Sequence, residues 1–227
     1  MLKAINKWGF TALEWARLLG NEESPHTSKV VLPRYKRTVD LNPKQFQTTF
    51  GARYLRHSHF ESEARLEEVL RNCPLLIKWL GTANREYARQ YKKEIATGHV
   101  AEVIIRWIDD EIGYGLFADA DLPEGAFVGE YTGVIRRIYR KAPDSNPYCM
   151  HYPTKWWSLK YFAIDSSTEG NELRFVNHSR SQANLQPLCA MERNLLHWIF
   201  VTTCEVNKGE QLFFDYGDAF RFVNRYN

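Results

Sequence analysis

The chain has 227 residues, enough for one or two domains with a sizeable hydrophobic core. Hydrophobic residues make up 44% of it and aromatic residues 14%, a composition typical of a folded protein and not of a disordered one. The net charge is only +3, because 30 basic residues are interleaved with 27 acidic ones, and this argues against nucleic acid as the primary ligand.

The first hundred residues are predicted to be mostly helical. Thr11 is a candidate N-cap of a short helix, and a second helix is expected over residues 61–72. Pro74 is expected to open a third helix, which would end at a C-cap formed by Gly98. Residues 24–33 are expected to form a loop or linker.

After Gly98 the pattern changes to short runs rich in Val, Ile, Phe, Tyr and Trp, separated by turn residues. One helical turn is expected around residues 169–175. Many short strands predict a compact β-rich domain that begins near Gly98. The expected strands are 103–108, 115–118, 127–131, 161–165, 195–203 and 211–214.

The four cysteines are far apart in the sequence, and none forms a Cys-x-x-Cys pair. We therefore expect neither a structural zinc cluster nor a disulfide-rich extracellular protein. No segment has the length and apolar composition of a membrane span or of the core of a secretory signal, so no membrane partner is expected.

The segment from Gly113 to Ala118 fits the glycine spacing of dinucleotide-binding loops. Those loops need a helix directly after the glycines to present its N-terminus to a pyrophosphate. Here the turn residues 123–125 follow instead, so a nicotinamide cofactor is not expected. A bend that glycine permits between two strands explains these glycines equally well.

Two later segments carry an amide, an imidazole and a phenol: Arg-Phe-Val-Asn-His-Ser at 174–179 and Phe-Phe-Asp-Tyr-Gly at 213–217. These groups suit the binding of an adenosyl cofactor and the alignment of a reaction. Alone, an Asn-His pair more often belongs to a turn, with a histidine whose hydrogen bonds are made locally, than to a ligand site. A tyrosine at a strand end is more often a core residue than a catalytic one. Their order after Gly-Tyr-Gly at 113–115 and Glu-Tyr-Thr-Gly at 130–133 favours a functional role.

In this order the four segments closely resemble the motifs of the SET-domain protein lysine methyltransferases. The resemblance covers roughly residues 100 to 217. It implies a mainly β SET-domain fold of short curved sheets with a pseudoknot, in which the strand before Tyr216 passes beneath the loop of Asn177 and His178. We expect a helical N-terminal region at 1–98, a catalytic domain at 99–217 and an aromatic C-terminal flank at 218–227.

The resemblance also implies S-adenosyl-L-methionine as cofactor and a protein lysine as substrate. Tyr216 and Tyr131 are the catalytic candidates. Phe214 stands where the family uses Phe or Tyr to tune the number of methyl groups, and phenylalanine predicts di- or trimethylation. The expected cofactor contacts are Gly113, Tyr114, Gly115, Tyr148, Arg174, Asn177 and His178, and the expected walls of the lysine channel are Phe214, Trp157 and Phe162. Simple packing is an equally good explanation of Tyr148.

The sequence departs from the family directly after Ser179. Arg180 replaces a cysteine, Ala183 replaces a proline, and Asn184 lies one residue further on than in many relatives. In relatives with a zinc-bound flanking segment, that cysteine joins a terminal cysteine cluster, and both are missing here. We therefore expect no metal, and we expect aromatic residues of the flank to pack over the site instead, namely Phe220, Phe222 and Tyr226.

Within the family, the closest resemblance is to compact bacterial SET proteins of the chlamydial type, effectors that methylate histones or histone-like proteins. It rests on Lys-Trp-Leu-Gly at 78–81, Arg-Trp-Ile at 106–108 and Tyr-Cys-x-x-Tyr-Pro at 148–153. It implies a histone or histone-like tail as substrate, and a protein of the bacterial cytoplasm that is secreted into a host cell and its nucleus.

A rival interpretation is a catalytically inactive SET domain that binds a histone tail or another partner. The N-terminal helices would then be an interaction surface, and in either case they could form a homodimer. Acidic residues could favour a basic peptide, unless they only keep a surface solvated; these are Asp109, Asp110, Glu111, Glu169 and Glu172.

Overall fold

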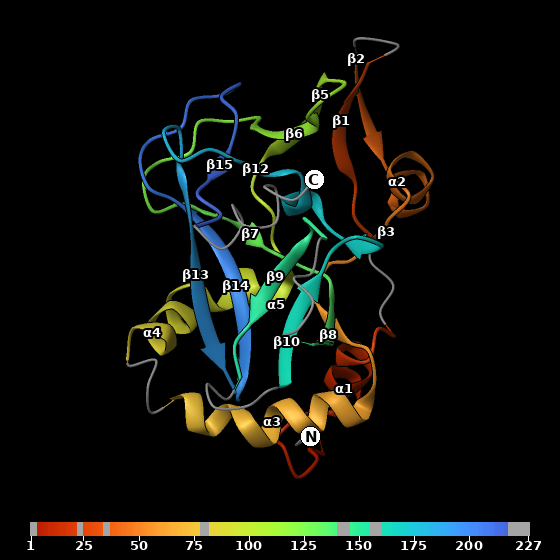
Figure 1. The fold of residues 1–227 in the computed structure, drawn as a ribbon, viewed down its shortest axis with the longest axis vertical. Helices are drawn as coiled ribbons and strands as arrows, with labels where there is room; N and C mark the ends of the chain where they lie inside the picture. The colour runs from red at the N-terminus through yellow and green to blue at the C-terminus, as the bar shows by residue number, and fades with distance from the viewer. Residues whose placement is uncertain are drawn as a thin grey trace.

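The structure is a computed structural model that describes residues 4–21, 25–33, 37–77, 82–139, 146–154 and 160–217. Short strands form several small sheets, and the helices lie around their margins (Figure 1). The mainly β fold class is confirmed. Within the described ranges no helix is both long and apolar enough to cross a membrane.

Local sequence signals place several N-terminal helices. Helix α1 (Ala12–Leu18) begins at Thr11, whose side chain and that of Glu14 form a reciprocal capping box, as the Thr11 cap predicted. Helix α2 (Pro43–Phe50) was not expected, although Asn42 and Gln45 form a second capping box before it.

The third helix was expected to begin at Pro74, and this prediction is wrong. Helix α3 (Glu63–Ile77) continues through Pro74. Leu66, Val69 and Leu70 are buried on its inner face, and this packing outweighs the one hydrogen bond that a proline removes. The later helical stretch consists of α4 (Ala83–Gln90) and α5 (Lys92–Thr97). Gly98 ends it in the left-handed conformation (φ 57°), which confirms the predicted C-cap.

The N-terminal region contributes strands as well as helices. The loop expected at 24–33 is wrong, because Ser28–Leu32 forms strand β1, which pairs with β2 (Arg37–Leu41). Two-residue strands follow, β3 (Arg53–Tyr54) and β4 (His59–Phe60). Strands β1, β3 and β4 each pair in parallel with a strand from beyond Gly98. The N-terminal region therefore completes the sheets of the β-rich part, and the boundary near Gly98 stays a prediction.

Six expected strands are present within two residues of their predicted bounds: β5 (Val103–Asp109), β6 (Gly113–Ala118), β7 (Phe127–Glu130), β10 (Lys160–Asp165), β14 (Leu195–Thr202) and β15 (Phe213–Phe214). The expected helical turn is the 3₁₀ turn η1 (Glu172–Phe175), and β11 (Glu169–Gly170) precedes it. Strands not expected are β8 (Val134–Tyr139), β9 (Cys149–Tyr152), β12 (Asn177–His178) and β13 (Leu185–Glu192).

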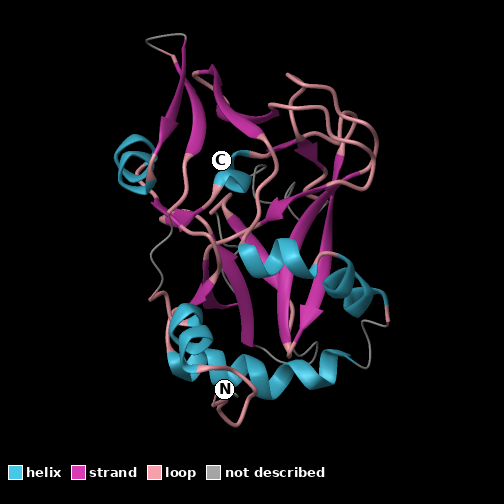
Figure 2. Ribbon diagram, turned by 180° about the vertical axis from the view of Figure 1, so that it is seen from behind, coloured by secondary structure: helices cyan, strands magenta, loops and turns pink. Residues whose placement is uncertain are grey.

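Three sheets of three or four strands have the orders β2-β1-β5-β6, β4-β8-β10-β9 and β13-β14-β7. Helices α4 and α5 lie against the β13-β14-β7 sheet (Figure 2), where Tyr91 and Ile95 pack against Phe127, Ile199 and Val201. Strand β12 pairs in parallel with β15, so two segments that are distant in the sequence lie side by side. This pair carries the predicted site.

Candidate active site

The β12–β15 pair places the Asn-His segment against the segment that leads to Tyr216. Asn177 lies opposite Phe213, and His178 lies opposite Phe214. The Asn184 side chain fixes the second strand, because its Oδ1 accepts a hydrogen bond from the Phe213 amide (2.9 Å). The shifted asparagine beyond the altered stretch therefore still holds the strand before Tyr216.

Tyr216 is held at both its backbone and its hydroxyl. Its amide donates to His178 Nδ1 (3.1 Å), and its hydroxyl donates to the carbonyl oxygen of Val176 (2.6 Å). Burial raises the pKa of Tyr216 well above its ordinary value, and the nearby Tyr148 adds to this rise. The phenol is therefore neutral across the physiological range and acts as a hydrogen-bonding group.

Tyr131 follows β7 and is buried, with 7% of its surface exposed. Its amide donates to the Trp198 carbonyl (2.8 Å), and its hydroxyl donates to the Tyr148 carbonyl (2.7 Å). Burial strongly raises the pKa of Tyr131, and the proximity of Tyr216 raises it further. The structure thus places both predicted catalytic tyrosines in one neighbourhood.

Aromatic rings connect these tyrosines. Phe214 lies 4.3 Å from Tyr216 and 4.8 Å from Phe200, measured between ring centroids. Tyr131 lies 6.4 Å from the same Phe200 ring. Sequence reasoning missed Phe200, whose only signal was an apolar position in the strand expected at 195–203. We call the group of Tyr131, Asn177, His178, Phe214 and Tyr216 the tyrosine site.

The predicted cofactor loop lies against Asn177. The Asn177 Nδ2 donates to the Tyr114 carbonyl (3.2 Å). A Cβ at Gly115 would lie 3.2 Å from that same Nδ2 and 2.7 Å from Gln211 Nε2, so a larger residue would have to displace these side chains. Gly113 has φ 77°, a conformation that favours glycine. A close backbone approach beside an amide and an imidazole fits an adenosyl cofactor, which offers both donors and acceptors.

Arg174 is buried and its donors go to the backbone. Its Nε and Nη2 donate to the carbonyls of Ser166 and Ser167 (3.0 Å each), and its guanidinium lies 4.5 Å from the Tyr148 ring. This stacking is a packing role that Tyr148 shares. Cofactor contacts by Arg174 and Tyr148 stay predictions.

The remaining channel residues are less well placed. Phe162 lies in β10 opposite Tyr152 and is 1% exposed, so its side chain belongs to the core. Its role as a channel wall stays a prediction. Trp157, the flank residues Phe220, Phe222 and Tyr226, and the Lys-Trp-Leu-Gly motif at 78–81 lie outside the described residues.

The altered stretch contributes a contact that sequence reasoning missed. Arg180, which stands where relatives have a cysteine, donates from Nε to Asp215 Oδ2 (2.9 Å). Asp215 Oδ1 accepts from the Gly217 amide (2.9 Å), and this bond together with Arg180 lowers the pKa of Asp215. The ion pair joins the altered stretch to the residue before Tyr216. The sequence showed the departure at Arg180 but not its partner.

Two acids expected to favour a basic peptide do not face solvent freely. Glu172 is 2% exposed and accepts hydrogen bonds from Ser28 and Tyr54, which corrects that expectation. Glu169 pairs with Arg53 and His59. The acids at 109–111 are exposed between β5 and β6. In the described part of the chain, no group of three or more His, Cys, Asp or Glu side chains could hold a metal ion.

Comparison with known proteins agrees with this geometry. Residues 113–217, which include every member of the tyrosine site, match the family model of the SET domain. This region of the chain therefore has the fold of a SET domain. A solved structure of ATXR5 in complex with histone H3.1 mono-methylated on R26 has the same fold, with a TM-score of 0.58 and 19% identity over 76% of this chain and 84% of that one.

Two curated relatives are more similar in sequence. The N-lysine methyltransferase KMT5A of Xenopus tropicalis is 36% identical over 114 residues, which is 47% of this chain and 33% of that protein. The histone-lysine N-methyltransferase EZH2 of Chaetomium thermophilum is 32% identical over 118 residues, 48% of this chain and 8% of that protein. The chain thus spans a third or less of the length of these two relatives.

Proposed function

We propose that this SET domain transfers a methyl group from S-adenosyl-L-methionine to a lysine of a histone or histone-like protein. The similarity to proteins named N-lysine and histone-lysine methyltransferases supports this reaction class. The observation that carries the proposal is the tyrosine site, where a neutral Tyr216 is held at its hydroxyl (2.6 Å to Val176) beside Asn177 and His178.

The reaction needs a neutral lysine amine. Its reference pKa is near 10.4, so deprotonation at pH 7 costs about 4 to 5 kcal/mol. The buried rings of Tyr131, Phe200 and Phe214 form an apolar surrounding that disfavours the ammonium and lowers this cost. When bound, the cofactor supplies an electrophilic methyl group on a positively charged sulfur.

Tyr216 acts by orientation and not as a permanent base. A neutral phenol oxygen can accept weak C–H···O contacts, each worth under about 1 kcal/mol, and the gain comes from alignment of the reacting groups. The bonds of Tyr216 to Val176 and His178 fix the position of this oxygen before substrate arrives. Gly115 and Asn177 would hold the cofactor beside it.

The direct test is methyl transfer to purified histones with labelled S-adenosyl-L-methionine. Tyr216→Phe should lower turnover by about 100-fold or more, because it removes only the aligning hydroxyl. Tyr87→Phe, a half-buried tyrosine on α4, is the matched control and should retain activity. Near-normal turnover of Tyr216→Phe would contradict the assignment. Calorimetry that detects no cofactor binding would instead favour the inactive binding module.

Phe214 sets the proposed degree of methylation. Its ring packs on Tyr216 and Phe200 and carries no hydroxyl to hold a water or restrain the amine. We therefore expect di- or trimethylated lysine in mass spectra, and fewer methyl groups from Phe214→Tyr. Product that stops at one methyl group in the unmodified protein would contradict this expectation.

We also propose that the protein acts in a host nucleus after secretion from a bacterium. The motifs at 106–108 and 148–153 support this through their resemblance to bacterial SET effectors. A translocation reporter fused to the full chain tests it, and reporter signal confined to the bacterium would contradict it.

A homodimer formed through the N-terminal helices is a separate proposal. It is supported by two large apolar residues of that region, Ile5 and Leu13, which are 65% and 75% exposed. Light scattering on the full chain tests it, and the mass of a single chain at high concentration would contradict it.

A further inference from the structure

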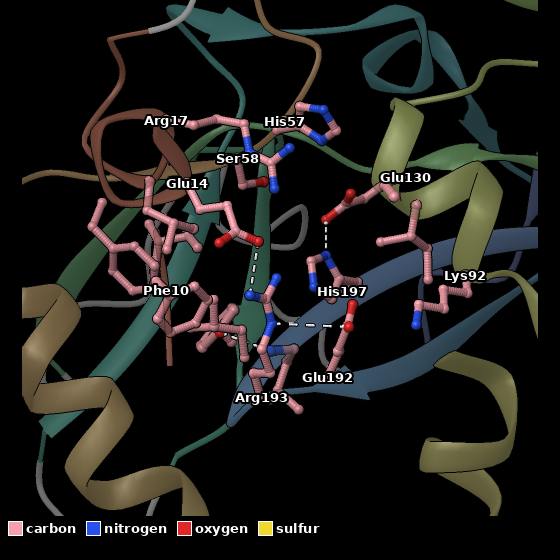
Figure 3. Close-up of a pocket in the computed structure, with 18 residues that line it drawn as sticks. Phe10, Glu14, Arg17, His57, Ser58, Lys92, Glu130, Glu192, Arg193 and His197 are labelled. Atoms are coloured by element: carbon pink, nitrogen blue, oxygen red, sulfur yellow. Dashed lines mark hydrogen bonds and ion pairs between the residues drawn. The ribbon is translucent and has the colours of Figure 1, made fainter. Parts of the chain in front are cut away.

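A cavity of about 410 Å³ lies between α1, α5 and the hairpin that joins β13 to β14. In Figure 1, α1 and this hairpin are at the lower part of the molecule, away from β12 and β15, and α5 lies above them near the middle. The volume is within the range of small-molecule sites, about 300 to 1,000 Å³, and far exceeds the roughly 30 Å³ of one water molecule. We call this the polar cavity because charged side chains from α1, α5, β7 and β13 line it (Figure 3).

Some of these charges are already paired. Glu14 Oε1 accepts from Arg193 Nη1 (2.8 Å), and Glu192 Oε1 lies 3.8 Å from Arg193 Nε. Arg193 also lies over the Phe10 ring at 4.5 Å. These three charged residues therefore have partners within the protein.

Glu130 is only half satisfied. Its side chain is 4% exposed, and its Oε1 bonds to His197 Nδ1 (2.8 Å). Its Oε2 is buried and has no hydrogen-bond partner among the residues that the structure describes. A buried carboxylate oxygen without a donor is costly, so a donor supplied from outside the chain would stabilise it.

Arg17 is the cationic counterpart. Its Nε is buried without a hydrogen-bond partner, and among the described residues no ion pair involves it. Figure 3 shows Arg17 reaching into the cavity from α1, with Glu130 reaching in from the opposite side. The two side chains do not form an ion pair with each other, and both line the same cavity.

The remaining lining fits a small organic ligand. Lys92 adds an exposed cation at the rim, while Leu18, Ile95 and Leu195 provide apolar walls. Burial lowers the pKa of His57 to about 4, so this histidine is neutral near pH 7 and adds no charge. The unpaired charges are therefore cationic, next to one carboxylate oxygen that requires a donor.

We propose that the polar cavity is a second ligand site, which binds a small carboxylate that also carries a hydroxyl or amino hydrogen-bond donor. The planar guanidinium of Arg17 binds the carboxylate through parallel N–H···O bonds. The hydroxyl or amino group donates to Glu130 Oε2.

Calorimetry on the full chain, without cofactor or histone, tests this with L-malate, L-aspartate and succinate. These probes share a four-carbon dicarboxylate skeleton and differ at one carbon, which bears a hydroxyl, an ammonium or hydrogen only. We expect malate or aspartate to bind about tenfold or more tightly than succinate. The malate and aspartate titrations distinguish a hydroxyl donor from an amino donor.

Variants connect the binding to the named atoms. Arg17→Gln should weaken binding about tenfold. Arg17→Lys should restore part of the affinity, because lysine keeps the positive charge but lacks the parallel N–H donors of the guanidinium. Glu130→Gln should remove the preference for malate or aspartate over succinate. Lys93→Gln, next to Lys92 and exposed, is the matched control and should bind as the unmodified chain does.

The proposal is overturned if neither malate nor aspartate binds at about 10 mM, or if all three probes bind equally. It is also overturned if Arg17→Gln, with unchanged thermal unfolding, binds as tightly as the unmodified chain. Because no methyl transfer is measured, these outcomes do not depend on the proposed function.

Discussion

The tyrosine site and the polar cavity meet at the end of β7, where Glu130 faces the cavity and Tyr131 belongs to the tyrosine site. In the tyrosine site, the polar side chains bond to the backbone: Tyr216 to Val176, Tyr131 to Tyr148 and Asn177 to Tyr114. In the polar cavity, Glu130 Oε2 and Arg17 Nε have no hydrogen-bond partner in the described part of the chain. Hydrogen bonds to the backbone fix side chains in place before a reaction. Unpaired charged groups instead indicate a site for a ligand that the chain does not supply.

The close packing of the backbone after Tyr131, next to the tyrosine site, predicts the largest effect on stability. A Cβ at Gly133 would lie 2.4 Å from the Asp165 carbonyl oxygen and 2.7 Å from its carbonyl carbon. Because backbone atoms cannot rotate away, Gly133→Ala should destabilise the protein by about 3 kcal/mol in urea unfolding.

Gly129→Ala is the matched control in the same region. Its Cβ would meet Leu173 Cδ2 at 2.5 Å, which is the end of a side chain that can move. We expect a loss of about 1 kcal/mol. Equal losses in the two variants would show that the packing at Gly133 is no tighter than elsewhere in the core.

The polar cavity predicts a pH effect through His57. Its folded-state pKa is lowered to about 4 by burial, against an ordinary value of 6.5. Between these values the unfolded chain binds a proton that the folded chain does not, so stability falls as pH drops from about 6.5 to about 4. We expect His57 to account for about 2 kcal/mol of this loss, measured by urea unfolding at pH 7 and pH 4.5.

The variant His57→Gln separates the contribution of His57 from those of the other histidines. It should flatten the profile of stability against pH. The pKa of His197 is raised by Glu130 despite its burial, so its contribution is fully present only below pH 6.5; it is the same in both proteins and cancels when the two profiles are compared. Burial also lowers the pKa of His151, but this histidine is present in both proteins and contributes equally to both profiles. An unchanged profile in His57→Gln would mean that His57 does not titrate in the folded cavity as expected.

The smallest effect is expected at the exposed ion pair of the tyrosine site. The side chain of Arg180 is 49% exposed and water screens the pair, so Arg180→Gln should change stability little. We expect turnover to fall by only about threefold. Asp215 still accepts the hydrogen bond from the Gly217 amide and therefore still shapes the turn after Phe214.

Arg85→Gln, an exposed arginine on α4, is the control for removing one positive charge. If Arg180→Gln lowered turnover as far as Tyr216→Phe, the ion pair would be essential for positioning Tyr216. The altered stretch would then have a larger role than its exposure indicates.

Local signals explain which elements could be predicted. The Thr11 capping box and the Gly98 C-cap use hydrogen bonds within a few residues, so the sequence alone specified both helix ends. Strand β1 could not be found in this way, because its partners in the sheet are β2 and the distant β5. The prediction at Pro74 failed for the same reason. Burial of one face of α3, and not the local preference of proline, keeps this helix continuous through Pro74.

The motifs around Tyr131, Asn177 and Tyr216 indicated the SET fold from sequence, because residues 113–217 match the family model of the SET domain. Only the tertiary structure decided which atoms they meet. The Tyr216 hydroxyl bonds to Val176, Arg180 pairs with Asp215, and Arg17 and Glu130 face one cavity. Each of these relations joins residues through parallel strand pairing or packing between distant elements, which no local pattern encodes.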